Sequence, residues 1–129
     1  KKLEDKNIDF EHLDLICCKP LDIKSIINSV KKTGRVIILD TGFKTNSVSS
    51  EIITLINENC FENLKHRPVR ITAPDIPEPT SYELTKFYYN NSDEILNKIL
   101  KIFNKKTNKK KLKQKDHHDI PGSWFKGPF

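Results

Sequence analysis

The sequence predicts an α/β fold with a mostly parallel sheet, arranged as three layers of helix, sheet and helix. Short runs of aliphatic residues alternate along the chain with segments whose apolar positions recur at helical spacing. One run, Val36–Leu39, is apolar without interruption, which is typical of a strand buried on both faces of a parallel sheet. The resulting β-α-β-α-β-α order favours parallel strands joined by helical crossovers.

The first third of the chain is expected to form a strand followed by a helix. Residues 1–7 have the composition of a last helical turn, and residues 8–16 alternate apolar and polar side chains as a strand does. Residues 21–33 place their apolar side chains on one helical face. Asp22 is suited to capping the start of this helix, and Gly34 to ending it.

The middle of the chain is expected to hold two further strands around one helix. Residues 35–40 are the central strand, which Gly42 is expected to break. Residues 47–61 form the next helix, with apolar side chains on one face. A third strand follows at 69–72, and three prolines make residues 73–79 an extended loop.

The last part of the chain is expected to contain helices and then a basic tail. Residues 82–89 suggest a short helix or turn, and Ser92 is expected to cap a helix over 93–103. Residues 1–103 are therefore assigned to one domain. Residues 104–115 form a lysine-rich linker, and residues 116–129 form an aromatic tail.

Composition limits the class of protein. The chain has 129 residues, enough for one domain with a sizeable core, and no apolar run is long enough to span a membrane. From its opening residues, we expect no signal peptide. An odd number of cysteines, with Cys17 and Cys18 adjacent to each other and Cys60 apart, is a poor disulfide framework. We therefore expect a reduced, cytoplasmic chain in which the adjacent pair is partly buried.

No catalytic constellation is visible in the sequence. Dinucleotide, phosphate-loop, serine-hydrolase and zinc-protease motifs are all absent. The pair His117-His118 beside Asp119 could bind a metal, but two adjacent histidines do not readily face one site. A polar linker is the better interpretation of these residues.

One loop is a candidate site for an anion or a partner. Lys44, Thr45, Asn46 and Ser47 lie between a buried strand and the start of a helix. The free N–H groups and dipole of a helix N-terminus favour an anion there. The alternative is that Asn46 or Ser47 simply caps the helix, and the absence of phosphate-loop glycines favours this alternative.

The charge of the chain is concentrated in its tail. Residues 104–115 hold seven lysines and no acid, although the whole chain has a net charge of +6. Such a tract could bind nucleic acid or another polyanion through phosphate contacts. No aromatic residues interleave with the lysines, as they do in single-strand binders, so a solvated linker is the better interpretation.

Four segments, taken in order, resemble the C-terminal domain of the transketolase-like superfamily. The resemblance is in particular to the beta subunit of the decarboxylating component of thiamine-diphosphate-dependent 2-oxo acid dehydrogenases. The segments are Leu13–Asp22, Ser29–Asp40, Glu51-Ile52 with Asn59–Leu64, and Val69–Pro79. The family usually has an acidic residue and glycines where Thr41, Asn46 and Ser47 stand here.

The resemblance implies a subunit of an enzyme whose chemistry takes place in other domains. The full enzyme would decarboxylate pyruvate or a branched-chain 2-oxo acid with thiamine diphosphate and Mg, and pass the acyl group to a lipoyl arm. It implies no catalytic, cofactor-binding or metal-binding residue in this chain. The implied role is assembly into a homo-oligomer or an alpha/beta heterotetramer, with docking of the acyltransferase component in several complexes. A transketolase or a related synthase remains an alternative.

The resemblance also suggests where contacts are made. Asp75, Pro77 and Pro79 are expected to shape a rigid interface loop at the carboxyl edge of the sheet. A docking tail is expected to use its aromatic side chains, which are Trp124, Phe125 and Phe129.

The resemblance implies that the family domain begins upstream of Lys1, with a strand that lies between those expected at 8–16 and 35–40. The domain in this chain is therefore expected to lack the family's first strands. We predict that the two remaining strands close up, or that an exchanged strand or a partner fills the gap.

Overall fold

The computed structural model describes residues 2–81, 84–85 and 88–107. Contacts divide the chain into two compact units, Lys1–Asp75 and Ile76–Phe129, a division that falls inside the predicted 1–103 domain. The predicted docking tail, its residues Trp124, Phe125 and Phe129, and most of the lysine tract lie outside the described residues.

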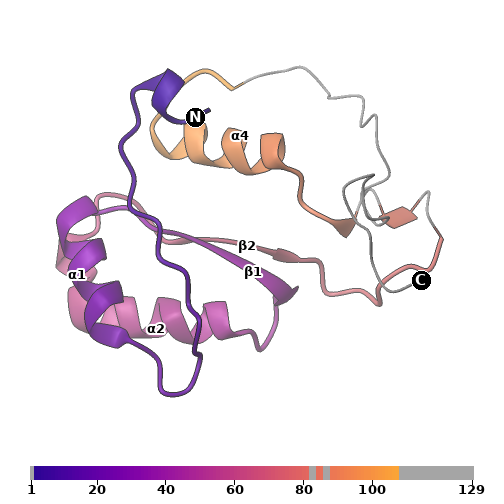
Figure 1. Ribbon diagram of the computed structural model, residues 1–129, viewed down its shortest axis with the longest axis horizontal. Coiled ribbons are helices and arrows are strands. Elements are labelled where there is room, and N and C mark those ends of the chain that lie inside the picture. The colour runs from indigo at the N-terminus through magenta and orange to yellow at the C-terminus, as the bar shows by residue number, and fades with distance from the viewer. Residues whose placement is uncertain (1, 82–83, 86–87, 108–129) are drawn as a thin grey trace, which may run out of the picture. The chain divides into compact units, whose positions relative to one another are not determined.

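The first unit has an α/β architecture (Figure 1). Helix α2 contacts both strand β1 and helix α1, and the two helices lie on the same side of the sheet in Figure 1. The elements of this unit are the 3-10 helices η1 (Glu4–Lys6) and η2 (Phe61–Asn63), the helices α1 (Ile23–Thr33) and α2 (Val48–Cys60), and the strands β1 (Ile37–Phe43) and β2 (Val69–Ala73).

Strands β1 and β2 form a parallel pair, which confirms the predicted α/β class. Leu39 lies opposite Ile71, and Phe43 lies opposite Ala73, so the register is irregular between these two points. The prediction that Gly42 breaks the strand is wrong, because β1 continues through it to Phe43. The extra residues of β1 are accommodated by the irregular register instead, as in a β-bulge.

Helix α1 has both predicted caps. The Asp22 carboxylate accepts hydrogen bonds from the Ser25 N–H (3.1 Å) and hydroxyl (2.6 Å). These hydrogen bonds lower the pKa of Asp22. At the other end, Gly34 has a φ of 69° and donates its N–H to the Val30 carbonyl at 2.7 Å. Glycine adopts a left-handed C-cap of this kind without strain, because it has no Cβ.

The core of the first unit lies between the helices and one face of the sheet. Its central residue is Ile56 of α2, whose side chain is fully buried. The aliphatic residues that pack around it come from both helices and from β1, as the helical periodicity predicts. The buried members are Ile26, Val30, Ile52, Ile56 and Cys60, and the partly buried ones are Leu15, Leu21, Ile27, Val36, Ile38 and Leu64.

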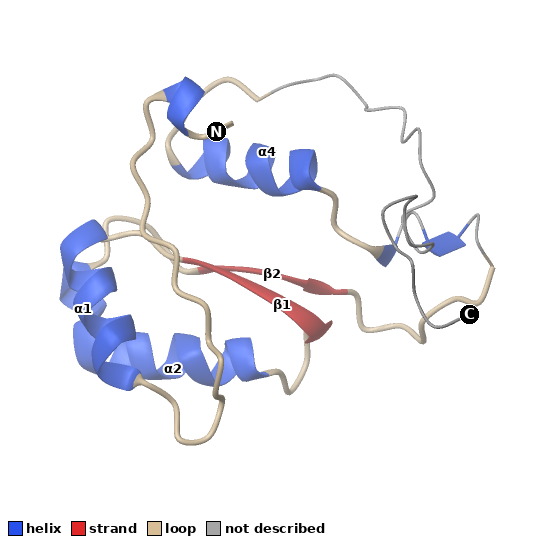
Figure 2. Cartoon of the chain, in the orientation of Figure 1, coloured by secondary structure: helices blue, strands red, loops and turns tan. Residues whose placement is uncertain are grey.

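Residues 8–16 do not form the predicted strand. They run as a loop, drawn in tan in Figure 2, and β1 is hydrogen-bonded only to β2 among the described residues. The predicted closing up of two strands therefore does not occur. A strand forms only where a neighbouring strand exchanges backbone hydrogen bonds with it, and in the described part of the chain β2 is the strand that does so with β1.

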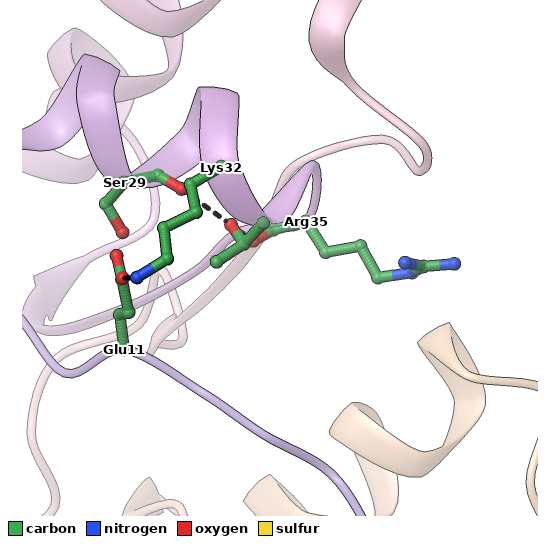
Figure 3. Close-up of polar contacts among 5 residues, drawn as sticks. Glu11, Ser29, Lys32 and Arg35 are labelled. Carbon is green, nitrogen blue, oxygen red and sulfur yellow. Dashed lines mark hydrogen bonds and ion pairs between the residues drawn. The ribbon is translucent and has the colours of Figure 1, made fainter.

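Side-chain contacts hold this segment instead of a backbone ladder. Ile8 is buried, and Leu15 packs against the core. Glu11 forms an ion pair with Lys32 of α1, as Figure 3 shows. The hydrogen bond from Lys32, followed by one from Ser29, lowers the pKa of Glu11, while Glu11 raises the pKa of Lys32.

The second unit contains helix α4 (Ser92–Ile102). Its cap is Asn91 and not Ser92 as predicted: the Asn91 side chain accepts from the N–H groups of Asp93 and Glu94, and Glu94 accepts in return from the Asn91 N–H. This reciprocal capping box satisfies N–H groups that the first turn leaves free. Within residues 82–89, only 84, 85, 88 and 89 are described, and the first three are helical.

No helix within the described residues is long and apolar enough to cross a membrane.

Candidate functional site

The candidate loop lies at the carboxyl edge of the sheet. Residues 44–47 connect the end of β1 to the start of α2, and residues 74–75 follow the end of β2. Because the strands are parallel, both segments leave the sheet at the same edge. This edge is where open α/β sheets bind ligands and partners, and three charged side chains organise it here.

The first of these side chains is Asp40, which is only partly exposed on β1. Its Oδ1 accepts the Gly42 N–H at 2.8 Å, and its Oδ2 accepts the Ser49 N–H at 3.0 Å. Burial acts to raise the pKa of Asp40, but hydrogen bonds from Gly42, Ser49 and Ser47 outweigh it and leave the pKa below its usual value. The carboxylate therefore supplies negative charge to the N-terminal turn of α2, where the helix dipole favours it.

The second is Arg70 on β2, which reaches across to the loop. Its guanidinium Nη1 donates to the Lys44 carbonyl at 2.7 Å, to the Ser50 hydroxyl, and to the Ser47 hydroxyl at 3.4 Å. A guanidinium presents several donors in a fixed plane, so one side chain of β2 fixes both the start of the loop and the first turn of α2.

The third is Asp75, just beyond β2. Its carboxylate accepts the Thr45 N–H at 2.8 Å and the Thr45 hydroxyl at 2.8 Å. The N–H and then the hydroxyl of Thr45 are the main causes of the lowered pKa of Asp75. Through this contact the loop after β2 is tied to the loop after β1, across thirty positions of sequence.

A small cluster of serine hydroxyls completes the start of α2. Ser47 occupies the cap position, but its side chain makes no capping bond to the backbone. Its hydroxyl lies 2.6 Å from the hydroxyl of Ser49, which is fully buried. The preceding Asn46 has a φ of 55°, a left-handed conformation that asparagine tolerates better than most residues.

These contacts decide what the loop can do chemically. The Ser49 N–H of α2 points to Asp40, so an incoming anion would compete with a carboxylate already in place. The Thr45 hydroxyl is engaged by Asp75. Within the described residues no three His, Cys, Asp or Glu side chains lie close enough to hold a metal ion. The geometry is that of a pre-formed surface loop and disfavours a small-anion site. Ser47 occupies the cap position without a side-chain capping bond, so the acceptor at the start of α2 is Asp40 and not the predicted Asn46 or Ser47.

The structure brings some of the predicted site residues together and places others in a different unit. Lys44, Thr45, Asn46 and Ser47 lie together in the loop, and Asp75 contacts it directly. Pro77 and Pro79 belong to the second unit.

Sequence reasoning missed Asp40 and Arg70, whose side chains hold the loop. A usable signal for Asp40 was present, since an acidic residue followed a buried strand just before a helix. Arg70 offered none, because its contacts depend on strand pairing.

Exposed apolar side chains flank the loop on both sides. Leu39 and Phe43 of β1 are 59% and 49% exposed, and Val48, the first residue of α2, is 43% exposed. Ile38 packs in the core and Asp40 contacts α2, so Leu39 faces the opposite side of the sheet from α2.

A family model and similar proteins from several organisms agree on the family to which this chain is related. The model of the family described as transketolase, C-terminal domain, matches residues 1–95. Relatives named pyruvate dehydrogenase E1 component subunit beta include those of Porphyra purpurea, 42% identical over 96 residues, and Mesostigma viride, 34% identical over 106 residues. These alignments cover 74% and 82% of this chain but 29% and 32% of the relatives.

A second kind of relative is also found. The 2-oxoisovalerate dehydrogenase subunit beta of Pseudomonas aeruginosa is 36% identical over 84 residues, which are 65% of this chain and 24% of that protein. The chain thus spans about a third or less of the length of the relatives that it matches.

Proposed function

The chain belongs to the transketolase C-terminal domain family, and we propose that it is the non-catalytic assembly domain of a thiamine-diphosphate-dependent 2-oxo acid dehydrogenase beta subunit. The names of the relatives support this proposal, since they are beta subunits of pyruvate and 2-oxoisovalerate dehydrogenases. The relatives do not decide between pyruvate and a branched-chain 2-oxo acid, because both kinds match.

The observation that carries the proposal is the pre-formed loop at the carboxyl edge of the sheet. Asp40, Arg70 and Asp75 satisfy its polar groups internally, so little of its hydrogen-bonding capacity is left for a small substrate. A surface already held in one conformation loses little entropy when a partner binds. The exposed Leu39 and Phe43 next to it supply the apolar anchors that such interfaces use.

The cofactors of the proposed enzyme are assigned to its other parts. We propose that thiamine diphosphate and Mg bind in parts of the enzyme outside this chain, as the family resemblance implies. The partners of this domain are accordingly proposed to be other subunits, in a homo-oligomer or an alpha/beta heterotetramer. The acyltransferase component is a further candidate partner.

The proposal is tested by measuring assembly in the complete dehydrogenase. Replacing Leu39 and Phe43 together by serine is expected to weaken subunit association about tenfold or more. The reason is that truncating a buried interface anchor costs about 1 kcal/mol or more in binding free energy. Native mass spectrometry across a dilution series measures this. Phe61→Ser, at a 67% exposed apolar residue beyond α2, is the matched control and is expected to leave association unchanged.

Two results would contradict the proposal. One is association of the double variant that equals that of the parent protein, with circular dichroism showing the same fold. The other is decarboxylation of a 2-oxo acid by this chain alone when thiamine diphosphate and Mg are supplied, since that activity needs a catalytic site within it.

The basic composition of residues 104–115 supports a second candidate function, the binding of nucleic acid or another polyanion. The tract lies mostly outside the described residues and is judged on its seven lysines. A gel-shift titration at several salt concentrations discriminates the two functions. Binding through phosphates would weaken steeply with salt and vanish on deletion of residues 105–115, whereas no shift at low salt rejects it.

A third candidate is the C-terminal domain of a transketolase or a related synthase, which shares the fold. The relatives named above are dehydrogenase subunits, which favours the first proposal. Ketol transfer between sugar phosphates by the complete enzyme, without 2-oxo acid decarboxylation, would select this third candidate.

A further inference from the structure

The adjacent cysteines Cys17 and Cys18 are both exposed free thiols. This differs from the sequence-based expectation of a partly buried pair of small apolar side chains. The third cysteine, Cys60, is buried in the core, and burial raises the pKa of its thiol. The chain therefore has two accessible thiols side by side and one protected thiol that serves as an internal reference.

The backbone around the pair belongs to neither a helix nor a strand. It runs through bends between residues 8–16 and α1, and the Cys17 thiol donates to the Lys19 carbonyl at 3.2 Å. A thiol is a weak donor, so this contact is easily exchanged for another. The side chain of the preceding Ile16 is 95% exposed, so the whole turn is open to solvent. Torsions here can change without disrupting a helical or sheet hydrogen bond.

We propose that Cys17 and Cys18 form a vicinal dithiol site, which small disulfides such as oxidised glutathione convert reversibly into a ring disulfide. One cysteine thiolate attacks the disulfide, forms a mixed disulfide and releases one glutathione thiolate, which takes up a proton. The neighbouring thiolate then attacks the cysteine sulfur of the mixed disulfide and releases the second glutathione. In sum the protein loses two protons and two electrons, and oxidised glutathione gains them to become two thiols.

The second step is favoured by proximity. The resolving thiol is attached one residue from the mixed disulfide, so its attack is intramolecular and competes well with a second glutathione. Access matters equally for thiol exchange, and both sulfurs are on exposed residues. No other described cysteine shares these properties, because Cys60 lies in the core.

The product is expected to be readily reduced again. The Cα atoms of consecutive residues are about 3.8 Å apart. Unstrained disulfides join residues whose Cα atoms are about 4.4–6.8 Å apart. A strained, exposed disulfide has a higher reduction potential than a structural one. The site is therefore suited to reversible modification and not to permanent stabilisation. Ring formation would also restrain the turn that leads into α1.

Mass spectrometry of the intact chain tests the inference. The reduced protein is incubated with oxidised glutathione, the remaining thiols are alkylated, and the masses of the products are measured. The parent chain is expected to lose two alkylatable thiols, to carry no glutathione and to keep Cys60 free. Cys17→Ser and Cys18→Ser are each expected to stop at a stable adduct of one glutathione, because the resolving thiol is gone.

Cys60→Ser is the matched control and should form the ring as the parent chain does. Dithiothreitol should restore both thiols. The inference is overturned if the parent chain accumulates a glutathione adduct as the single variants do. It is also overturned if both thiols remain alkylatable, or if disulfide-linked dimers form in place of the ring on a non-reducing gel.

Discussion

Replacing Asp40 by alanine tests whether this one side chain holds the edge of the sheet together. The carboxylate accepts the N–H groups of Gly42 and Ser49 at 2.8 and 3.0 Å. Alanine leaves both groups without that acceptor. Asparagine of nearly the same shape keeps one acceptor oxygen but carries no charge, so Asp40→Asn is the matched control.

The expected loss of unfolding free energy in Asp40→Ala depends on how exposed the two N–H donors are. Gly42 is exposed, so water can replace the lost acceptor at little cost. Ser49 is fully buried, and an N–H left unsatisfied there costs about 1–3 kcal/mol. Loss of negative charge at the start of α2 adds about 0.3–1 kcal/mol. Asp40→Ala is therefore expected to lower the free energy of unfolding by about 2–3 kcal/mol, and Asp40→Asn by about 1 kcal/mol.

The pH dependence gives an independent check. The pKa of Asp40 is lower in the folded chain than its ordinary value, so its contribution to stability is present above the unfolded pKa. The contribution is lost as the pH falls through the folded value. The difference in stability between the parent chain and Asp40→Asn should therefore be constant near neutrality and shrink below about pH 4.

Urea denaturation followed by circular dichroism, at neutral and acid pH, measures both effects. The reasoning is refuted if Asp40→Ala stays within about 0.5 kcal/mol of the parent chain, the range of an ordinary surface substitution. It is also refuted if the difference between the parent chain and Asp40→Asn does not depend on pH, because the charge would then be irrelevant.

Four further substitutions test other parts of the first unit. Gly34→Ala should cost about 1–2 kcal/mol in urea denaturation, since φ is 69° and a Cβ would lie 2.9 Å from the Lys65 side chain; equal stability would contradict the left-handed cap. Ile56→Ala empties a fully buried position and should cost about 2–5 kcal/mol, whereas a smaller loss would mean a loosely packed core. Asp75→Asn should lower the melting temperature at neutral pH but not in acid, because the lowered pKa of Asp75 makes its contribution disappear as the pH falls through the folded value; a difference that persists in acid would argue against it. Glu11→Gln should speed proteolysis within residues 8–16 at low salt, and the effect should fade as salt screens the exposed ion pair with α1; unchanged cleavage would show that apolar contacts alone hold the segment.

The sequence predicted the elements that depend on local patterns. Helix α1 has the predicted end and both predicted caps, because Asp22 and Gly34 act through their own neighbours in sequence. The strand over Val69–Ala73 and the helix α2 differ from prediction by about a residue at their ends. The core residues followed from the same helical periodicity.

The errors arose where an outcome depends on a distant part of the chain. Residues 8–16 have an alternating pattern, but a strand also needs a neighbour to accept and donate its hydrogen bonds, and β1 pairs with β2 alone among the described residues. Gly42 reads locally as a strand breaker, yet pairing with β2 continues to Phe43.

By itself, the sequence determined the α/β class, the elements from α1 to β2 and the family, because these depend on periodicity and on motifs that lie along the chain. Only the tertiary structure decided how the loop at residues 44–47 is held. Arg70 and Asp75 reach it because parallel pairing brings the carboxyl ends of β1 and β2 to one edge. Their hydrogen bonds, with those of Asp40, occupy polar groups that an anion would need and hold the loop in one conformation.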